Sequence, residues 1–556
     1  MPEPASAAST AAHHTRPDDR RRDTSARLLE DFHDPDGPAA QRSFARDHDL
    51  PRSTLRHWLH RQQALDAPAQ EVAFFESPAG LAFLHRMQVA AHLVFTQQGP
   101  GGLRLIGLFL RLCRLDPFVA SSYGSQQQFG RTLEEEVLAY EQAERPRLAA
   151  QMRPKEITAC QDETFHPQVC LVAIEPVSNF LLLERYVPQR DQKAWDEAMR
   201  QALEGLPVKV VQTVGDQAKA LVAHAEHGLG VPKGPDLFHL EHDLCRALAP
   251  ALARQTRAEH KRLAWAQGRT AALRADQARA QTQPRPPGRP VDYPQRIAQA
   301  EQVEAVVARD VARAEGRQEQ LRQQLQGFSD ADHPFDLETG QAQSAEAVRG
   351  RLQGRLQALK QLAQEARLGA KALQAVAGVE ALLGEVVGVV ALFWLRVAAV
   401  RQGLPEPVRE VWQSRLLAAA YLRRVAGRLR GAQRRAAVRA LAESLVAGLS
   451  APAGVSEQAW QEARRLAEEC AGWFVRGSSC VEGRNGQLEL RHHSLHRLSP
   501  RKLGVLTVVH NYWLKRADGT TAAERFFGGK PKDLLAWLCE RLPLPARPAR
   551  RRPKAA

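Results

Sequence analysis

The sequence predicts an α/β core that is interrupted by a large all-helical insertion and preceded by an N-terminal helix-turn-helix. Three observations support this fold class: strand-like runs between residues 151 and 250, an almost continuous helical pattern from residue 244 to 471, and two short helical patterns near residue 50. The 556-residue chain is 44% hydrophobic and 25% charged. These ordinary values exclude wholesale disorder, and the length predicts about three to four domains.

The N-terminal part predicts a DNA-binding module. Residues 1–24 are rich in Ala, Ser, Pro and charged residues, which predicts a disordered leader. Residues 25–66 predict a helix-turn-helix, because Leu50-Pro51 forms a turn between two helical patterns, and the polar face of the second helix would enter a major groove. This face carries Arg52, Ser53, Arg56 and His57. An ordinary helical hairpin with a solvated basic face is the alternative, and residues 67–150 follow as a helical linker or accessory region.

Residues 151–250 are assigned to the first part of the α/β core. Runs of β-branched and aliphatic residues bounded by turn residues predict strands over residues 157–165, 169–174, 179–186, 208–214 and 236–240. Helices are predicted over residues 192–203 and 217–227. The resulting order, β-β-β-α-β-α-β, is that of an RNase H-like fold, in which the first and fourth strands are neighbours.

The C-terminal half is dominated by helical patterns. Residues 251–470 predict an all-helical insertion with coiled-coil-like helices, in which the pattern of residues 294–326 and 343–375 suits a long helical hairpin or a coiled coil. The most apolar run, Val386–Leu395, has ten residues and is too short to cross a bilayer, so a soluble protein without a membrane partner is expected. Residues 471–530 are assigned to the second part of the core, and residues 531–556 to a C-terminal helix and a basic tail.

The charge balance favours a polyanionic partner. The chain has 77 Lys and Arg against 62 Asp and Glu, a net charge of +15, which favours double-stranded DNA, although a coding bias toward Ala and Arg gives a similar picture. Arginines are dense over residues 415–439, where they are expected to neutralise phosphates without reading bases. They include Arg423, Arg424 and Arg428, for which a solvated helix face is the alternative. The seven cysteines form no CxxC pair, which argues against a zinc ribbon and fits a reducing cytoplasm.

Two aspartates are expected to meet at one edge of the predicted sheet. Asp162 lies on the first strand and Asp216 directly follows the fourth. Carboxylates of this kind bind hard cations, and two Mg²⁺ or Mn²⁺ ions would activate the attacking oxygen and stabilise the leaving oxygen of a phosphodiester. A surface carboxylate at Asp162 and a helix N-cap at Asp216 are the structural alternatives. His239, near the end of the predicted fifth strand, is expected to approach this site or to be a structural histidine.

The segment after the helical insertion makes a family resemblance specific. The motifs are QDETF at residues 161–165, GDQAKAL at 215–221, DLFHLEHDL at 236–244, HPFDLETG at 333–340, VEGRNGQLEL at 481–490 and HN…R.DGTTAAERFF at 510–527. Together with the helix-turn-helix at the start, they make the chain resemble a bacterial insertion-sequence transposase of the DDE class over roughly residues 25–530.

The resemblance implies a catalytic triad of Asp162, Asp216 and Glu482 that coordinates two Mg²⁺ ions, for which Mn²⁺ can substitute. It implies cleavage at transposon ends with water as the nucleophile, and then attack of the freed 3′-hydroxyl on target DNA. Glu489 lies about two helical turns beyond Glu482 and is an alternative third carboxylate.

Arg484 and Asn485 are expected to hold a phosphate or the catalytic glutamate, with solvated loop residues as the alternative. The expected assembly is a homodimer or a higher oligomer in a synaptic complex with transposon ends and target DNA, in a bacterial cytoplasm and associated with the nucleoid. Two other functions stay open: a non-catalytic DNA-binding protein, such as a silenced transposase or a regulator, and an RNase H-like nuclease without strand transfer.

Overall fold

A computed structural model of the chain describes residues 28, 31–32, 40–63, 68–166, 168–284, 289–495 and 498–545. The chain divides into two compact units, residues 1–153 with 486–556 and residues 154–485. The predicted leader lies outside the described residues. Asp162, Asp216, His239 and Glu482 belong to the second unit, and the alternative carboxylate Glu489 belongs to the first.

The first unit begins with the predicted pair of short helices. Helix α2 (Gln41–Asp47) and helix α3 (Arg52–Gln63) pack through Phe44, Ala45 and Leu55, which are buried together. The chain turns between them at Asp49, whose φ of 46° is in the left-handed region. The prediction of two helices joined by a tight turn is confirmed.

The rest of the first unit is helical and combines both ends of the chain. Tyr140 on α7 donates a hydrogen bond to the carbonyl of Lys532 (2.6 Å), and Lys502 on α20 pairs with Glu134 on α7 (3.1 Å). The bounds are α4 (Ala69–Glu76), α5 (Pro78–His92), the π-helix η1 (Leu93–Gln98), α6 (Leu103–Leu112), α7 (Tyr123–Gln151), α20 (Pro500–Tyr512), α21 (Ala522–Phe527) and α22 (Leu534–Arg541). Residues 486–530 therefore belong to this unit, in contrast to the prediction that residues 471–530 form the second part of the core.

The second unit contains a five-stranded mixed sheet with the order β3-β2-β1-β4-β5. Its strands are β1 (Lys155–Phe165), β2 (Val169–Glu175), β3 (Phe180–Val187), β4 (Val208–Gly215) and β5 (Lys233–Pro235). Strands β1, β2 and β3 pair antiparallel, and β4 runs parallel to both β1 and β5. Helix α8 (Gln192–Leu203) follows β3, and α9 (Lys219–Ala223) continues into the π-helix η2 (His224–Leu229).

The predicted fifth strand is wrong. Residues 233–235 form β5, and Leu237 begins helix α10, which continues to Thr282. The reason is local: the Asp236 side chain accepts hydrogen bonds from the backbone N–H groups of Phe238 and His239 and so caps a helix at this point. His239 consequently lies in the first turn of a helix.

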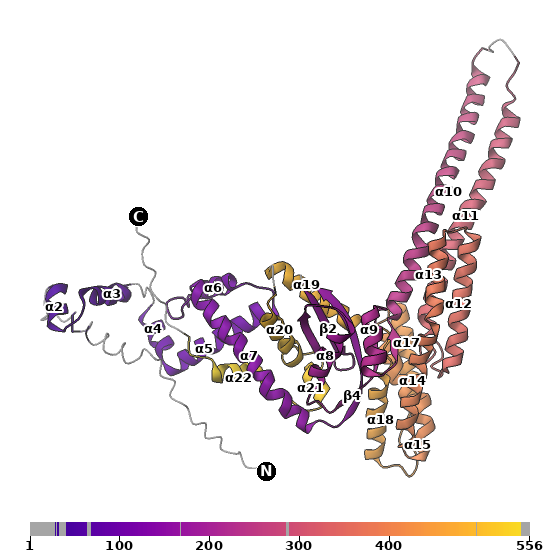
Figure 1. The fold of residues 1–556 in the computed structure, drawn as a ribbon. Helices are drawn as coiled ribbons and strands as arrows, with labels where there is room; N and C mark the ends of the chain where they lie inside the picture. The colour runs from indigo at the N-terminus through magenta and orange to yellow at the C-terminus, as the bar shows by residue number, and fades with distance from the viewer. Residues whose placement is uncertain are drawn as a thin grey trace. The chain divides into compact units, whose positions relative to one another are not determined.

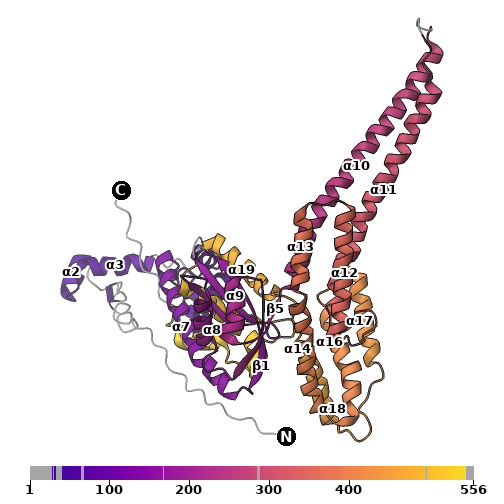
Figure 2. The same cartoon turned by 45° about the vertical axis from the view of Figure 1, so that its right-hand side comes forward.

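The insertion is all-helical, as predicted, but its long hairpin uses different segments. Helix α10 (Leu237–Thr282) runs beside α11 (Tyr293–Ala331), and both extend past α12 and α13 (Figures 1 and 2). The predicted partners, residues 294–326 and 343–375, also pack against each other through α11 and α12, but the longer hairpin is formed by α10 and α11. The remaining elements are α12 (Ala345–Glu365), α13 (Ala370–Ala381), α14 (Leu383–Gln402), α15 (Glu406–Val411), η3 (Trp412–Leu417), α16 (Ala418–Ala426), α17 (Ala432–Val446) and α18 (Glu457–Ala471).

One helical stretch is long and apolar enough to cross a membrane by length and composition. It spans Ala370–Gln402, 33 residues, and is longer than the ten-residue apolar run noted in the sequence. Nearly half of its most apolar window (44%) is buried inside the structure, where Val386, Val390 and Phe393 belong to the helical core. This burial is consistent with a core helix of a soluble protein.

The predicted fold class requires correction. The structure is 69% helical and has one small five-stranded sheet, so the protein is a helix-rich protein and is not assigned to the RNase H-like fold. The strand patterns identified a real sheet, but this sheet occupies only residues 155–235 of the chain. Helix α10 alone has 46 residues, and it starts where the last strand was expected.

Candidate metal centre

The ends of β1 and β4 bring Asp162 and Asp216 to the same edge of the sheet. The parallel pairing of these strands ends with Cys160 opposite Val214, and each aspartate follows two residues later. Gly215 is required between them, because a Cβ at this position would lie 2.5 Å from the carbonyl oxygen of Gln161. The close backbone approach that only glycine permits therefore fixes the spacing of the two aspartates.

Asp162 is half-buried and is held by two donors. Its Oδ1 accepts the backbone N–H of Glu163 (2.8 Å), and its Oδ2 accepts Nδ2 of Asn485 (2.9 Å). Burial raises the pKa of Asp162 to about 6, and the nearby negative charge of Asp216 adds to this effect. A carboxyl group that is costly to ionise in the free protein is a group that a bound cation would stabilise in its charged form.

Two further side chains act on Asp162 electrostatically. The charge of Glu482 raises the pKa of Asp162, and His239 lowers it. Glu482 lies in the first turn of α19 (Ser479–Leu495), and its Oε1 is 3.2 Å from Nε2 of His239. Ligand atoms of Asp236, His239 and Glu482 all lie within 4.8 Å of one another, a spacing that can hold a metal ion. Asp162 is thus electrostatically coupled to Asp216, Glu482 and His239, whereas the ligand atoms close enough together to hold one ion are those of Asp236, His239 and Glu482.

Asp236 is a ligand candidate that the sequence reading missed. Its Oδ2 accepts the backbone N–H (2.7 Å) and the hydroxyl (2.5 Å) of Ser478, while its Oδ1 accepts the first N–H groups of α10. The carboxylate is buried, and Gly477 is needed beside it because a Cβ there would lie 2.8 Å from Oδ1. With these four hydrogen bonds Asp236 joins the starts of α10 and α19, so its main role is to position His239 and Glu482. An Asp before a helical apolar pattern was the available signal.

Helix α19 is anchored by a buried ion pair. Nε and Nη2 of Arg484 donate to the two carboxylate oxygens of Glu184 on β3, both at 2.7 Å, and the side chains are 6% and 0% exposed. The structure therefore places Arg484 inside the unit, where its guanidinium is engaged, and does not present it to a phosphate. Asn485 holds Asp162 and is likewise a positioning residue.

A second buried contact fixes the segment that leads into α19. Nη2 of Arg476 pairs with Oδ2 of Asp332 (2.8 Å) and donates to the carbonyl of Ser329 (2.8 Å) at the end of α11. Burial raises the pKa of Asp332 to about 6, although Arg476 acts in the opposite direction. This contact joins the end of α11 to the segment that leads into α19, the helix that carries Glu482.

Two other glutamates lie away from the cluster. Glu163, next to Asp162, accepts Nε1 of Trp195 (3.0 Å), as strand alternation predicts. Glu489 is exposed beside His493 (3.7 Å) and falls in the first unit. Of the two candidate third carboxylates, Glu482 is the one that shares the cluster with Asp162.

The predicted DNA-contacting residues outside this centre are mostly exposed. On α3, Arg52, Ser53 and Arg56 are exposed, and the side chain of His57 lies outside the described residues. In the second unit Arg423 pairs with Glu468 (2.8 Å), Arg424 is half-buried, and Arg428 is exposed. These positions leave the basic face of α3 and Arg428 accessible to a polyanion.

Comparison with known proteins gives one partial match. Residues 412–554 match a family of unknown function (DUF6399), and the match includes Glu482, Arg484 and Asn485. No curated protein and no solved structure matches the chain.

Proposed function

We propose that the protein is a DNA transposase that cleaves phosphodiesters at transposon ends and joins the freed 3′-hydroxyl to target DNA. The observation that supports this most is the electrostatic coupling of Asp162 on β1 to Asp216 at the end of β4 and to Glu482 on α19. The proposal rests on this site and on the resemblance of its motifs to DDE transposases. It does not depend on the fold class of the sheet.

The residues of the cluster fit a divalent cation. The donors are hard carboxylate oxygens, which Mg²⁺ and Mn²⁺ prefer. Burial raises the pKa of Asp162, and repulsion from Asp216 and Glu482 adds to this effect. Among the described residues, Oδ1 of Asn485 is also a buried acceptor without a hydrogen-bond partner. A cation with its bound water would compensate both features.

The roles of the protein groups follow from their contacts. Asp162, Asp216 and Glu482 would hold Mg²⁺, which when bound supplies Lewis-acid stabilisation of the attacking and leaving oxygens of the phosphodiester. Asn485 keeps Asp162 in its orientation, and His239 does the same for Glu482.

The proposed partner is double-stranded DNA. The net charge of +15 and the exposed cations of α3 support it, because Lys and Arg that neutralise phosphates release counterions on binding. Joining two ends implies a homodimer or a higher oligomer in the DNA complex. The proposed location is the cytoplasm, in association with the nucleoid.

The decisive experiment is Mg²⁺-dependent cleavage of DNA that carries the sequences flanking this coding region. We expect wild type to nick at the element end, Glu482→Gln and Asp216→Asn to lose at least about 100-fold in rate while still binding DNA, and Glu489→Gln, on the same helix, to cleave normally. Binding without cleavage in Mg²⁺ or Mn²⁺ would leave a non-catalytic DNA-binding protein. Cleavage without joining would leave a nuclease.

A further inference from the structure

A stripe of four cations and one tryptophan runs along one exposed face of helix α10. It lies further along this helix than His239 of the metal centre. Its members are spaced by three or four residues and so lie on the same side of the helix. They are Arg254, Arg257, Lys261, Trp265 and Arg269. All five are exposed, Trp265 to 62%, and the stripe spans about 22 Å at about 1.5 Å per residue. We call this set the α10 stripe.

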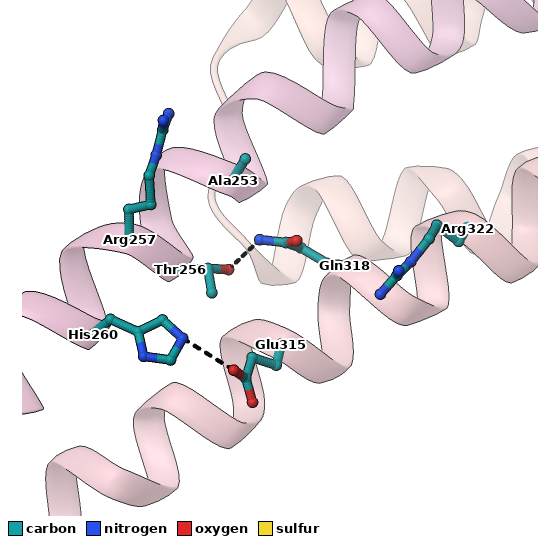
Figure 3. A pocket seen from close by; sticks show the side chains of 7 residues that line it. All are labelled: Ala253, Thr256, Arg257, His260, Glu315, Gln318 and Arg322. Atoms are coloured by element: carbon teal, nitrogen blue, oxygen red, sulfur yellow. Dashed lines mark hydrogen bonds and ion pairs between the residues drawn. The ribbon is translucent and has the colours of Figure 1, made fainter.

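The inward face of α10 makes the contacts that hold the hairpin together. Polar side chains of the two helices meet on this face. Nε2 of His260 lies 3.0 Å from Oε1 of Glu315, and Nε2 of Gln318 donates to the hydroxyl of Thr256 (2.5 Å). Figure 3 shows these side chains pointing toward one another, while Arg257 points away from α11. Arg257 is therefore not needed to pair α10 with α11.

Most other cations of the hairpin are neutralised within it. Arg262 pairs with Glu259 (2.7 Å), Arg274 with Glu301 (2.5 Å), Arg313 with Asp310 (3.5 Å) and Arg322 with Glu319 (2.9 Å). In contrast, no carboxylate of the described chain lies within ion-pair distance of the four cations in the α10 stripe. The four cations of the stripe thus stay uncompensated among the described residues.

An aromatic side chain lies within this positive face. The guanidinium of Arg269 lies 5.5 Å from the ring centroid of Trp265, and both residues line a shallow cavity of about 510 Å³ together with Arg296 and Val303 of α11. Arginine forks match phosphate geometry, and an exposed indole provides apolar area for a sugar or a base. This combination of cations and an exposed ring is typical of nucleic-acid surfaces.

We infer that the α10 stripe is a second DNA-binding surface, which contacts the phosphate backbone of a duplex without reading its sequence. The inference rests on the proposed function only for the identity of the partner. A second copy of the same face fits poorly, because an isologous contact would place two positive stripes against each other. At about 3.4 Å per base pair, the stripe covers about six base pairs.

The test compares two variants with the same change in charge on the same hairpin. The stripe variant carries Arg254→Gln, Arg257→Gln, Lys261→Gln and Arg269→Gln. The control carries Arg262→Gln, Arg274→Gln, Arg313→Gln and Arg322→Gln, at cations that already have carboxylate partners. Binding of a 30-base-pair duplex is followed by fluorescence anisotropy between about 50 and 200 mM salt.

We expect the slope of log K against log salt to fall by about 3 to 4 in the stripe variant and by less than about 1 in the control, at about 0.9 per phosphate contact. Trp265→Ala should weaken binding several-fold with an unchanged slope. Circular dichroism checks that the helices are intact. Equal slopes in the two variants overturn the inference, as does a change of sedimentation coefficient in the stripe variant without DNA, which would identify a contact between copies.

The same proteins separate this inference from the proposed function. If wild type binds through the stripe but never cleaves in Mg²⁺, the transposase proposal fails and the DNA surface remains. If wild type cleaves and the stripe variant binds like the control, the metal-centre proposal remains and the stripe is not a DNA surface. If wild type does not bind the duplex at any salt concentration, the stripe inference is wrong.

Discussion

Replacement of Arg484 by Met tests whether one buried ion pair holds the helix that carries Glu482. Arg484 is 6% exposed and its partner Glu184 is 0% exposed, and two hydrogen bonds of 2.7 Å join them. Methionine keeps much of the apolar volume of the arginine stem. It leaves a buried carboxylate without the guanidinium that neutralises it.

The expected loss of stability is about 3 kcal/mol at neutral pH. Removal of one partner of a buried ion pair costs about 3–5 kcal/mol, because the remaining charge stays away from water. We take the lower end of this range.

The assay is urea unfolding followed by circular dichroism, together with hydrogen exchange of the amides of residues 479–489. The double variant Arg484→Met/Glu184→Leu should recover most of the stability, because it removes both charges. The matched control is Arg465→Met, whose partners Glu462 and Glu469 are exposed, and it should cost less than about 1 kcal/mol. Faster exchange in α19 is expected only in the Arg484→Met single variant.

Two results would refute this reasoning. A loss below about 1 kcal/mol for Arg484→Met would mean that the ion pair contributes no more than an exposed one. A double variant as unstable as the single variant would mean that lost packing, and not the buried charge of Glu184, accounts for the effect.

Three other predictions concern the metal centre. Gly215→Ala should slow cleavage by at least about 100-fold, since its Cβ would lie 2.5 Å from the carbonyl of Gln161, whereas Gly483→Ala, which has open space, should cleave normally in the same assay. Asn485→Ala should weaken Mn²⁺ binding about 10- to 100-fold in electron paramagnetic resonance titrations, because it removes the 2.9 Å hydrogen bond to Asp162; unchanged affinity would exclude the positioning role. Burial raises the pKa of Asp162 to about 6, so without metal its contribution to stability is complete below about pH 4 and is lost as the pH rises through about 6. The free energy of unfolding in urea of Asp162→Asn minus that of wild type should therefore be about 2 kcal/mol larger at pH 7.5 than at pH 4.5. A difference that is independent of pH would contradict the raised pKa of Asp162.

The sheet was predictable because its signals are local. The strands β1 to β4 are short runs of β-branched and aliphatic residues between turns, and they lie within two residues of the predicted bounds. The fifth strand failed because Asp236-Leu-Phe-His-Leu240 also begins a helical pattern. Leu240, Leu244, Leu248 and Leu252 continue that pattern at a spacing of four and are all buried, so the helical period outweighs a short apolar run.

The partners of the site residues were not predictable from local pattern. Arg484 looks like a surface arginine in the sequence, and its partner Glu184 lies 300 residues earlier on a different element. The clamp between Asp236 and Ser478 joins residues 242 positions apart. Such pairs depend on how the helical insertion returns to the sheet, which no hydrophobic period encodes.

That return explains how one site can include residues on both sides of a large insertion. Helix α10 leaves the sheet at Leu237, whose backbone N–H bonds the carbonyl of Arg476 (2.9 Å), and the chain comes back at the same point. Ser478 bonds Asp236 directly after this contact, and Glu482 follows one turn later, 3.2 Å from His239. Because the two ends of the insertion are joined at its base, the spacing of the metal-site residues is fixed by short-range hydrogen bonds. Apart from His239 and the contact of Arg476 with Asp332, the insertion can therefore vary in length and contents, including the α10 stripe, without moving the carboxylates of the metal centre.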